Sequence, residues 1–235
     1  TASSFLSAWV ASGVPNIDGR HKHIKEANPP FAHPANAREL SSMNAEIPHL
    51  FFDYVDPLSY LLEQEISGLL EESGIAPLRL VPLELRRPPE PMVDPEGEGW
   101  QERWNASHAL AEDRNIHFRQ PVVVPWTRKA HELVLHAESK GLGGGAHGAL
   151  FDAFLLEGRD IGRVDILVEI ARGLGLDPME AKAVLDVDRY SNEVSALGDR
   201  ARASGIDAPP ALTFGNATLQ GFHNRDALRT FLCSR

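Results

Sequence analysis

The chain of 235 residues carries a formal net charge of −10, and 43% of its residues are hydrophobic. This hydrophobic content is enough to build a core and excludes a chain that is disordered throughout, whereas the acidic balance disfavours nucleic acid or an anionic membrane surface as a partner. Because Cys233 is the single cysteine, an internal disulfide and intramolecular Cys-x-x-Cys chemistry are both excluded. No apolar run approaches the roughly 18–20 residues of a membrane span, so we expect a cytoplasmic protein.

Residues 1–46 are rich in Pro, Ala, Asn, Ser and His, and Asn-Pro-Pro at 28–30 breaks any long element. We therefore expect an extended arm ahead of the folded domain. His21, His23 and His33 lie in this arm without a cysteine or carboxylate pattern that would complete a ligand set. Polar residues of an arm are thus a better interpretation than a metal site.

Residues 47–88 show the pattern of a β-α-β unit. The expected elements are a strand at Leu50–Val55, a helix at Pro57–Ser73 and a strand at Leu78–Leu85. Asp56 is the expected N-cap, because Asp there with Pro at the first helical position is a strong helix-start signal, and Gly74 is the expected stop. Pro82 cannot donate a ladder hydrogen bond, so the second strand is expected at a sheet edge or with a bulge.

Residues 98–204 are predicted to be almost entirely helical, with Gly, Pro or Asp in the separating segments. The expected helices are Glu98–Asn115, Thr127–Ser139, Ala146–Glu157, Arg163–Gly173, Pro178–Leu185 and Arg189–Ser204. The glycine-rich segment 141–145 lacks the Lys-Ser/Thr of a phosphate-binding loop and is interpreted as an interhelical loop. His131 and His136 are one residue too far apart for a His-Glu-x-x-His zinc motif, so no metal site is expected.

The chain then returns to strand signals. The expected elements are a strand at Pro210–Phe214, a two-residue hairpin turn at 215–216, a strand at Ala217–Gly221 and a helix at Arg225–Leu232. The order β-α-β, helical block, β-β-α is that of a thioredoxin-like α/β fold with a large all-helical insertion. The expected parts are an N-terminal arm at 1–46, a thioredoxin-like domain at 47–97 and 205–235, and a helical insertion at 98–204.

Four segments within residues 47–233 follow, in order, the motifs of a known family. They are Phe-Asp-Tyr-Val-Asp-Pro-Leu-Ser-Tyr-Leu at 52–61, Pro-Trp-Thr-Arg-Lys-Ala-His at 125–131, Ala-Leu-Phe-Asp-Ala-Phe at 149–154 with Gly-Arg-Asp-Ile at 158–161, and Gly-Ile-Asp-Ala-Pro-Pro-Ala-Leu at 205–212. In these segments the chain resembles the DsbA-like superfamily, in the branch of 2-hydroxychromene-2-carboxylate isomerases, kappa-class glutathione transferases and polyketide-associated DsbA-like proteins. Trp126 stands where that family usually has Asn.

The resemblance implies a cofactor-binding loop at Pro209 and Pro210. Pro210 would follow a cis peptide bond and face the turn at residues 56–59. In this family the residue before the cis-proline offers backbone hydrogen bonds to a thiol peptide or to glutathione. Pro209 has no N–H to donate, so only its carbonyl remains for such a contact. This departure weakens the expected binding of glutathione.

The resemblance also aligns Asp56 and Ser59 with the two cysteines of Cys-Pro-x-Cys. Neither forms the thiolate that thiol–disulfide exchange requires, so no dithiol oxidoreductase activity is expected at this turn. Related isomerases and transferases hold the glutathione thiolate with a serine at the first position, at the positive helix N-terminus. A carboxylate at Asp56 would fill that anion site and raise the thiol pKa. Asp56 is therefore a general base or polar anchor with Ser59 as its partner, or a plain N-cap, and these roles are compatible.

Arg128, Asn224 and Arg225 complete the binding residues that the resemblance implies. Arg128 follows Pro-Trp-Thr at 125–127, a segment expected to face the cleft. Asn224 and Arg225 resemble the Asp-Arg pair that receives the γ-glutamyl end of glutathione in related isomerases, and both arginines would bind carboxylates. The structural alternatives are that Asn224 caps the closing helix and that Thr127 caps the helix expected at Thr127–Ser139.

Three hypotheses about function remain. The leading one is a small-molecule isomerase or transferase that resembles 2-hydroxychromene-2-carboxylate isomerase, with glutathione as the candidate cofactor or with none. The second is a non-catalytic module that binds a ligand or peptide and descends from a thiol–disulfide oxidoreductase. Redox activity of Cys233 with a partner protein has the least support. The expected partners are a small-molecule substrate and, from the resemblance, a second copy of the chain in a homodimer; neither nucleic acid nor a membrane is expected.

Overall fold

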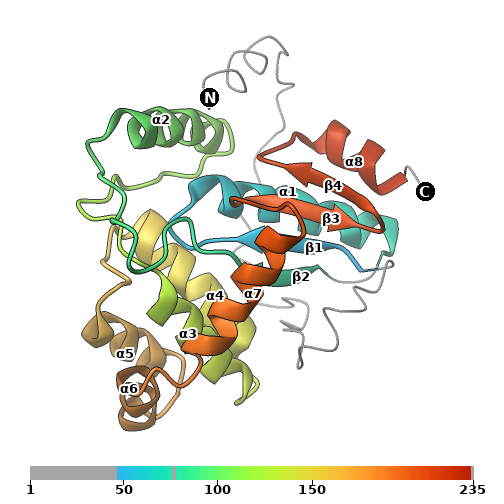
Figure 1. Cartoon of the computed structure of the whole chain (residues 1–235). Helices are drawn as coiled ribbons and strands as arrows, with labels where there is room; N and C mark the ends of the chain where they lie inside the picture. The colour runs from blue at the N-terminus through green and yellow to red at the C-terminus, as the bar shows by residue number, and fades with distance from the viewer. Residues whose placement is uncertain (1–46, 76–77, 234–235) are drawn as a thin grey trace.

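The computed structural model describes residues 47–75 and 78–233, and the expected arm at 1–46 lies outside the described residues. Within them, four short strands form one mixed sheet in the order β2-β1-β3-β4 (Figure 1). The strands are β1 (His49–Phe52), β2 (Arg79–Pro82), β3 (Ala211–Phe214) and β4 (Ala217–Gln220). β1 runs parallel to β2 and antiparallel to β3, and β4 is antiparallel to β3. The predicted thioredoxin-like α/β fold is thus confirmed.

The helices occupy the places that the sequence pattern indicates. They are α1 (Pro57–Ser73), α2 (Glu98–Glu112), α3 (Arg128–Glu138), α4 (Gly143–Phe151), the π-helix η2 (Asp152–Leu156), α5 (Val164–Gly173), α6 (Pro178–Asp186), α7 (Ser191–Ala203) and α8 (Arg225–Cys233). All helices from α2 to α7 lie between β2 and β3 in the sequence, which makes this block the predicted helical insertion. In the described ranges, no helix combines the length and the apolar character that crossing a bilayer requires.

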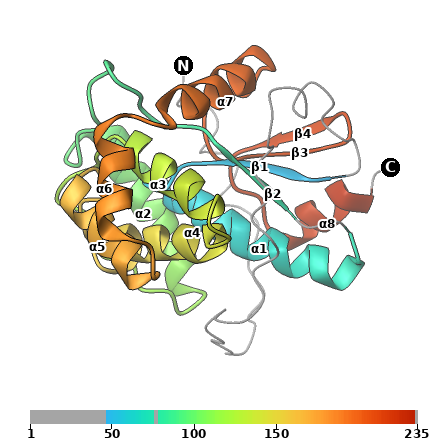
Figure 2. The same cartoon turned by 90° about the horizontal axis from the view of Figure 1, so that it is seen from below.

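The sheet separates two hydrophobic clusters. α1 and α8 lie on one face of the sheet and α7 on the other (Figure 2). Leu50 and Phe52 of β1 belong to the larger cluster with α1, whereas Phe51 belongs to the smaller cluster with Leu197 and Ala201 of α7. Successive side chains of a strand point to opposite faces, so one strand contributes to both clusters. All four β1 residues are buried as a result.

Local signals explain the ends of the first β-α-β unit. The predicted limits of α1 are confirmed, with Asp56 as N-cap and with Gly74 at the C-terminus in the left-handed conformation (φ 62°). Pro82 closes β2, which lies at the edge of the sheet as its missing N–H requires. β1 ends three residues earlier than predicted because the chain turns there: the N–H of Asp56 donates to the carbonyl of Asp53 at 3.1 Å.

The glycine-rich segment is the clearest error of local prediction. Residues 143–145 are not in a loop but form the first turn of α4, where the N–H of Ala146 donates to the carbonyl of Leu142 at 3.0 Å. A Cβ at Gly145 would lie 3.4 Å from a methyl group of Leu174, so a small residue allows the helix to approach the end of α5. Tertiary packing here overrides the low helix propensity of glycine.

Candidate functional site

The turn before α1 is built around the carboxylate of Asp56. The Oδ1 atom accepts the N–H of Leu58 at 3.3 Å, and Oδ2 accepts the N–H of Ser59 at 3.0 Å. The interpretation of Asp56 as an N-cap is thus confirmed, and its side chain is fully buried. The carboxylate occupies two of the N–H donors that a helix start leaves unsatisfied.

Ser59 adds its hydroxyl group to the same carboxylate. Its Oγ donates to Oδ2 of Asp56 at 2.5 Å and accepts the N–H of Asp53 at 3.4 Å. Ser59 is fully buried as well. The two predicted catalytic residues therefore lie in direct contact, as the interpretation of Ser59 as the partner of Asp56 requires.

Arg103 of α2 joins this turn to the loop before β3. Its Nε and Nη2 donate to Oδ1 of Asp56 at 2.9 and 2.7 Å, and Nη2 also donates to the carbonyl of Pro209 at 2.8 Å. The Pro209–Pro210 peptide bond is cis. The structure thus brings four predicted site residues, Asp56, Ser59, Pro209 and Pro210, to one place, and it adds an arginine from the helical insertion.

Arg103 changes the electrostatics expected for this turn. The sequence argument treats Asp56 as an uncompensated carboxylate that repels a thiolate, but its charge is paired with a guanidinium. Only one signal in the sequence could have led to Arg103: a carboxylate buried at a helix start needs a cation. With 23 lysines and arginines in the chain, that signal does not identify which one.

Two further buried polar pairs involve Asp53 and Tyr54, which precede the turn in the sequence. Asp53 accepts the N–H of Leu85 at 2.6 Å and contacts Nε2 of His131 at 3.3 Å. The hydroxyl group of Tyr54 lies 3.0 Å from Nδ1 of His147, whose Nε2 lies 2.8 Å from Glu63. Burial, with smaller contributions from nearby carboxylates, raises the pKa of Tyr54 well above its usual value. These pairs connect the segment just after β1 to α3 and α4.

Arg128 of α3 lies in a different network, which reaches α7. Its Nε and Nη2 donate to Oε2 of Glu84 at 3.0 and 2.5 Å, and its Nη1 donates to Ser191 and Ser195. The backbone carbonyl of Glu84 also accepts from Arg202 at 3.0 Å. The carboxylate that Arg128 binds is therefore one of the chain's own.

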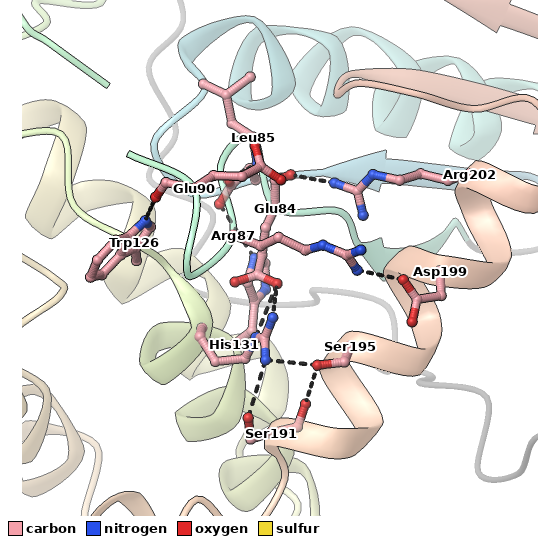
Figure 3. A network of polar contacts seen from close by, with 12 residues as sticks. Glu84, Leu85, Arg87, Glu90, Trp126, His131, Ser191, Ser195, Asp199 and Arg202 are labelled. Carbon is pink, nitrogen blue, oxygen red and sulfur yellow. Dashed lines mark hydrogen bonds and ion pairs between the residues drawn. The ribbon is translucent and has the colours of Figure 1, made fainter. Parts of the chain in front are cut away.

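Thr127, just before Arg128, is the N-cap of α3 in the structural alternative to a cleft role. It occupies the N-cap position as that alternative states, although its side chain makes no capping hydrogen bond. Its Oγ1 is buried without a hydrogen-bond partner in the described part of the chain. Trp126 is partly buried and donates from Nε1 to the carbonyl of Glu90 at 3.0 Å (Figure 3).

Asn224 and Arg225 lie at the start of α8. Asn224 accepts the N–H of Ala227 at 3.0 Å, which confirms the capping alternative. Arg225 donates to Glu72 at 2.5 Å and lies 3.9 Å from Glu65, two residues in the middle and last turns of α1. The predicted site residues thus divide among three places: the Asp56 turn, the α3–α7 contact and the α1–α8 contact.

Metal-ligating and thiol groups were the remaining candidates for chemistry in the described chain. In residues 47–75 and 78–233, no group of three or more His, Cys, Asp and Glu side chains could hold a metal ion. Cys233 is exposed at the end of α8.

Comparison with known proteins identifies the family. The model of the DSBA-like thioredoxin domain matches residues 49–232. This chain belongs to the DSBA-like thioredoxin domain family. Its single cysteine leaves it without the Cys-x-x-Cys pair, so the family's dithiol chemistry has no counterpart at residues 56–59.

Three similar proteins share 17–27% of their aligned residues with this chain. The chain is 27% identical over 182 residues to the uncharacterized protein YwbO of Bacillus subtilis (strain 168). These residues make up 75% of this chain and 90% of YwbO. The structure of 2-hydroxychromene-2-carboxylate isomerase is similar with a TM-score of 0.65 and 17% identity, over 79% of this chain and 92% of that one. The structure of the cytosolic disulfide reductase DsbM from Pseudomonas aeruginosa with GSH is similar with a TM-score of 0.57 and 20% identity. The match covers 79% of this chain and 96% of that one. At these identities the structural likeness describes the fold.

Proposed function

We propose that this DsbA-family chain is a small-molecule isomerase or transferase that works without dithiol chemistry at the Asp56 turn. One observation carries the proposal: Asp56 and Ser59, at the two cysteine positions, are bound to each other, and Arg103 holds Asp56 against the Pro209 loop. A charged pair at a helix N-terminus can orient a polar substrate, whereas no group there can form a mixed disulfide. The similarity in fold to 2-hydroxychromene-2-carboxylate isomerase supports this choice.

Glutathione is the candidate thiol cofactor of this proposal. The structure of DsbM with GSH supports it at the level of the family. In this chain the N–H groups of Leu58 and Ser59 already bind Asp56, and the carbonyl of Pro209 already binds Arg103. A glutathione thiolate at the start of α1 must therefore compete with Asp56 for the same donors. Weak binding is expected for the natural sequence.

Calorimetric titration with reduced glutathione near neutral pH tests this part. The natural chain is expected to bind weakly but saturably, and Asp56→Ser is expected to bind about tenfold more tightly because the competing carboxylate is gone. Asp165→Ser, which removes an exposed carboxylate paired with Arg163, is the matched control and should bind like the natural chain. Absence of binding in both the natural chain and Asp56→Ser contradicts the role of glutathione.

A non-catalytic binding module is the second candidate, and the burial of Asp56 and Ser59 favours it. Both side chains bond within the chain, so neither is open to a reactant in this conformation. A turnover assay with reduced glutathione and 1-chloro-2,4-dinitrobenzene separates the candidates, because the thiolate displaces chloride and forms a coloured thioether. If the natural chain turns over these substrates and Asp56→Ser changes the rate, the result supports an enzyme. Saturable glutathione binding without turnover supports the module.

A further inference from the structure

Helix α2 belongs to a segment that leaves the body of the molecule and returns to it. Val93, before α2, and Val124, after it, form an isolated antiparallel bridge. Apart from this bridge, residues 83–97 and 113–127 contain no helix or strand. Figure 1 shows the extended segments that lead to and from α2, which is set apart from α3, α5 and α6. α2 is therefore connected to the helical block only through irregular chain.

The base of this segment is fixed to the body at both ends. Beside the bridge, Nε1 of Trp126 donates to the carbonyl of Glu90 at 3.0 Å (Figure 3). On the returning side, the N–H of Arg119 donates to the carbonyl of Leu155 in η2 at 2.7 Å. The chain between these fixed points is residues 94–118, which we call the lid.

Two arginines of the lid bind the body along α1. Arg103 binds Asp56 at the start of α1 and the carbonyl of Pro209. Arg114, just after α2, donates from Nε and Nη2 to Oε1 of Glu65 in the middle of α1, at 2.8 and 2.6 Å. The two arginine side chains are 28% and 24% exposed. Partly exposed ion pairs contribute less stability than core packing, so the lid can open at a lower free energy than global unfolding requires.

The contacts of the lid close the Asp56 turn. The side chains of Asp56 and Ser59 are fully buried, and both oxygens of Asp56 accept hydrogen bonds. A reactant that contacts Asp56 must therefore replace one of its donors, and Arg103 is the donor that the lid carries. After Arg103 leaves, Asp56 keeps the N–H groups of Leu58 and Ser59 and the hydroxyl group of Ser59. Opening thus leaves the charge of Asp56 partly satisfied.

We propose that the lid opens about its fixed base to admit a reactant to Asp56 and Ser59, and that the pair of Arg114 and Glu65 sets the fraction of molecules with an open lid. The inference rests on the proposed function and adds the conformational step that a buried turn requires. Arg114 acts in this step as a positioning residue, because it holds the lid rather than the turn.

Labelling of buried cysteines with iodoacetamide separates lid opening from global unfolding. Ser107→Cys places a thiol on the buried face of α2, and Thr213→Cys places one in the inner strand β3, both in a chain that carries Cys233→Ser. The Oγ1 atom of Thr213 is buried without a hydrogen-bond partner in the described residues, so this substitution removes no bond. Each rate is divided by the rate of the same variant unfolded in urea.

Ser107→Cys should label about tenfold faster than Thr213→Cys. Its rate should also depend little on low concentrations of urea, because lid opening exposes much less surface than global unfolding does. The rate of Thr213→Cys should rise steeply with urea.

Arg114→Met should raise the labelling rate of Ser107→Cys about fivefold, because the lid loses its contact with Glu65. Ile170→Val in α5 is the matched control, since it removes a buried methyl group outside the lid and lowers global stability. It should accelerate the labelling of Thr213→Cys and leave that of Ser107→Cys unchanged.

Two results would overturn the inference: equal labelling rates of the two cysteines with the same dependence on urea, or an unchanged rate of Ser107→Cys in the Arg114→Met chain. If Ser107→Cys does not fold, amide hydrogen exchange in the natural chain provides the same comparison. The amides of α2 must then exchange faster than those of β3 and with less dependence on urea.

The two proposals can fail separately. Fast, urea-independent labelling of Ser107→Cys in a chain without turnover supports the lid and contradicts the enzyme. Turnover together with equal labelling rates of the two cysteines supports the enzyme and contradicts the lid.

Discussion

Two buried carboxylates in this molecule each pair with a partly exposed arginine, but the two pairs differ in which of their atoms form hydrogen bonds. Both oxygens of Asp56 are bonded, Oδ1 by Arg103 and Oδ2 by the first turn of α1. Glu84 bonds through Oε2 alone, to Arg128, and its Oε1 is buried without a partner in the described chain (Figure 3). Arg128 gives its Nη1 to two serines of α7, whereas the Nη1 of Arg103 has no acceptor among the described residues.

The two arginines differ in the group that each pair leaves unused. At Glu84 the unused group is a buried acceptor, which is not accessible to a dissolved molecule. We therefore infer that Arg128 stabilises the contact of α3 and α7 with the segment after β2. At Asp56 the acceptor is fully satisfied, and the unused group is a donor on an accessible side chain.

Arg128→Met is expected to have the largest effect. It leaves Glu84 as a buried, uncompensated carboxylate, which costs about 3–5 kcal/mol of unfolding free energy. Urea unfolding measures the loss, and the double variant Glu84→Gln/Arg128→Met should recover much of it. Arg163→Met is the control and should leave the midpoint unchanged, because its pair with Asp165 is exposed. An unchanged midpoint in Arg128→Met would show that Glu84 does not depend on Arg128.

Arg103→Met is expected to cost less, about 1–2 kcal/mol, in the same urea experiment. Asp56 would keep the hydroxyl group of Ser59 and two backbone N–H groups as donors, so its charge would remain partly satisfied. The comparison predicts a smaller loss than for Arg128→Met. The reverse order would mean that Arg103 is the structural residue and Arg128 is not.

Glu132→Gln is expected to have the smallest effect, and one that depends on pH. Burial raises the pKa of Glu132 above its usual 4.5, although the N–H of Tyr190 and the charge of Lys129 act in the opposite direction. The folded state therefore holds the proton more tightly than the unfolded state, and stability present below about pH 4.5 is lost as the pH rises through the folded pKa. Glu132→Gln should be more stable than the natural chain near neutral pH and equal to it at acid pH. A constant difference across a pH series would contradict this assignment.

The sequence predicts those features that depend on neighbouring residues. The limits of α1 follow from Asp56, Pro57 and Gly74, and the edge position of β2 follows from Pro82. The order of the elements around the helical insertion follows from periodicity and from turn residues, and it is correct throughout the described chain. These signals are local, so a single sequence contains them.

Partners that are distant in the sequence could not be predicted in this way. Arg103 is separated from Asp56 by 47 residues and from Pro209 by 106, and no periodic pattern connects them. The motif predicts Arg128 at the cleft, whereas in the structure Arg128 binds Glu84, which no motif identifies, and two serines of α7. The sequence does not predict the start of α4 at Gly143, and the neighbour of Gly145 there, Leu174, is likewise distant in the sequence.

A double-mutant cycle between Asp56 and Arg103 tests the central claim most directly. Asp56→Ser keeps a capping hydroxyl group and removes the carboxylate, Arg103→Gln removes the guanidinium, and urea unfolding of both single variants and the double variant gives the coupling free energy. The account predicts a favourable coupling of about 1 kcal/mol or more, because the two groups share hydrogen bonds at 2.7 and 2.9 Å. A coupling free energy of zero would contradict this account, because Arg103 would then not stabilise the Asp56 turn.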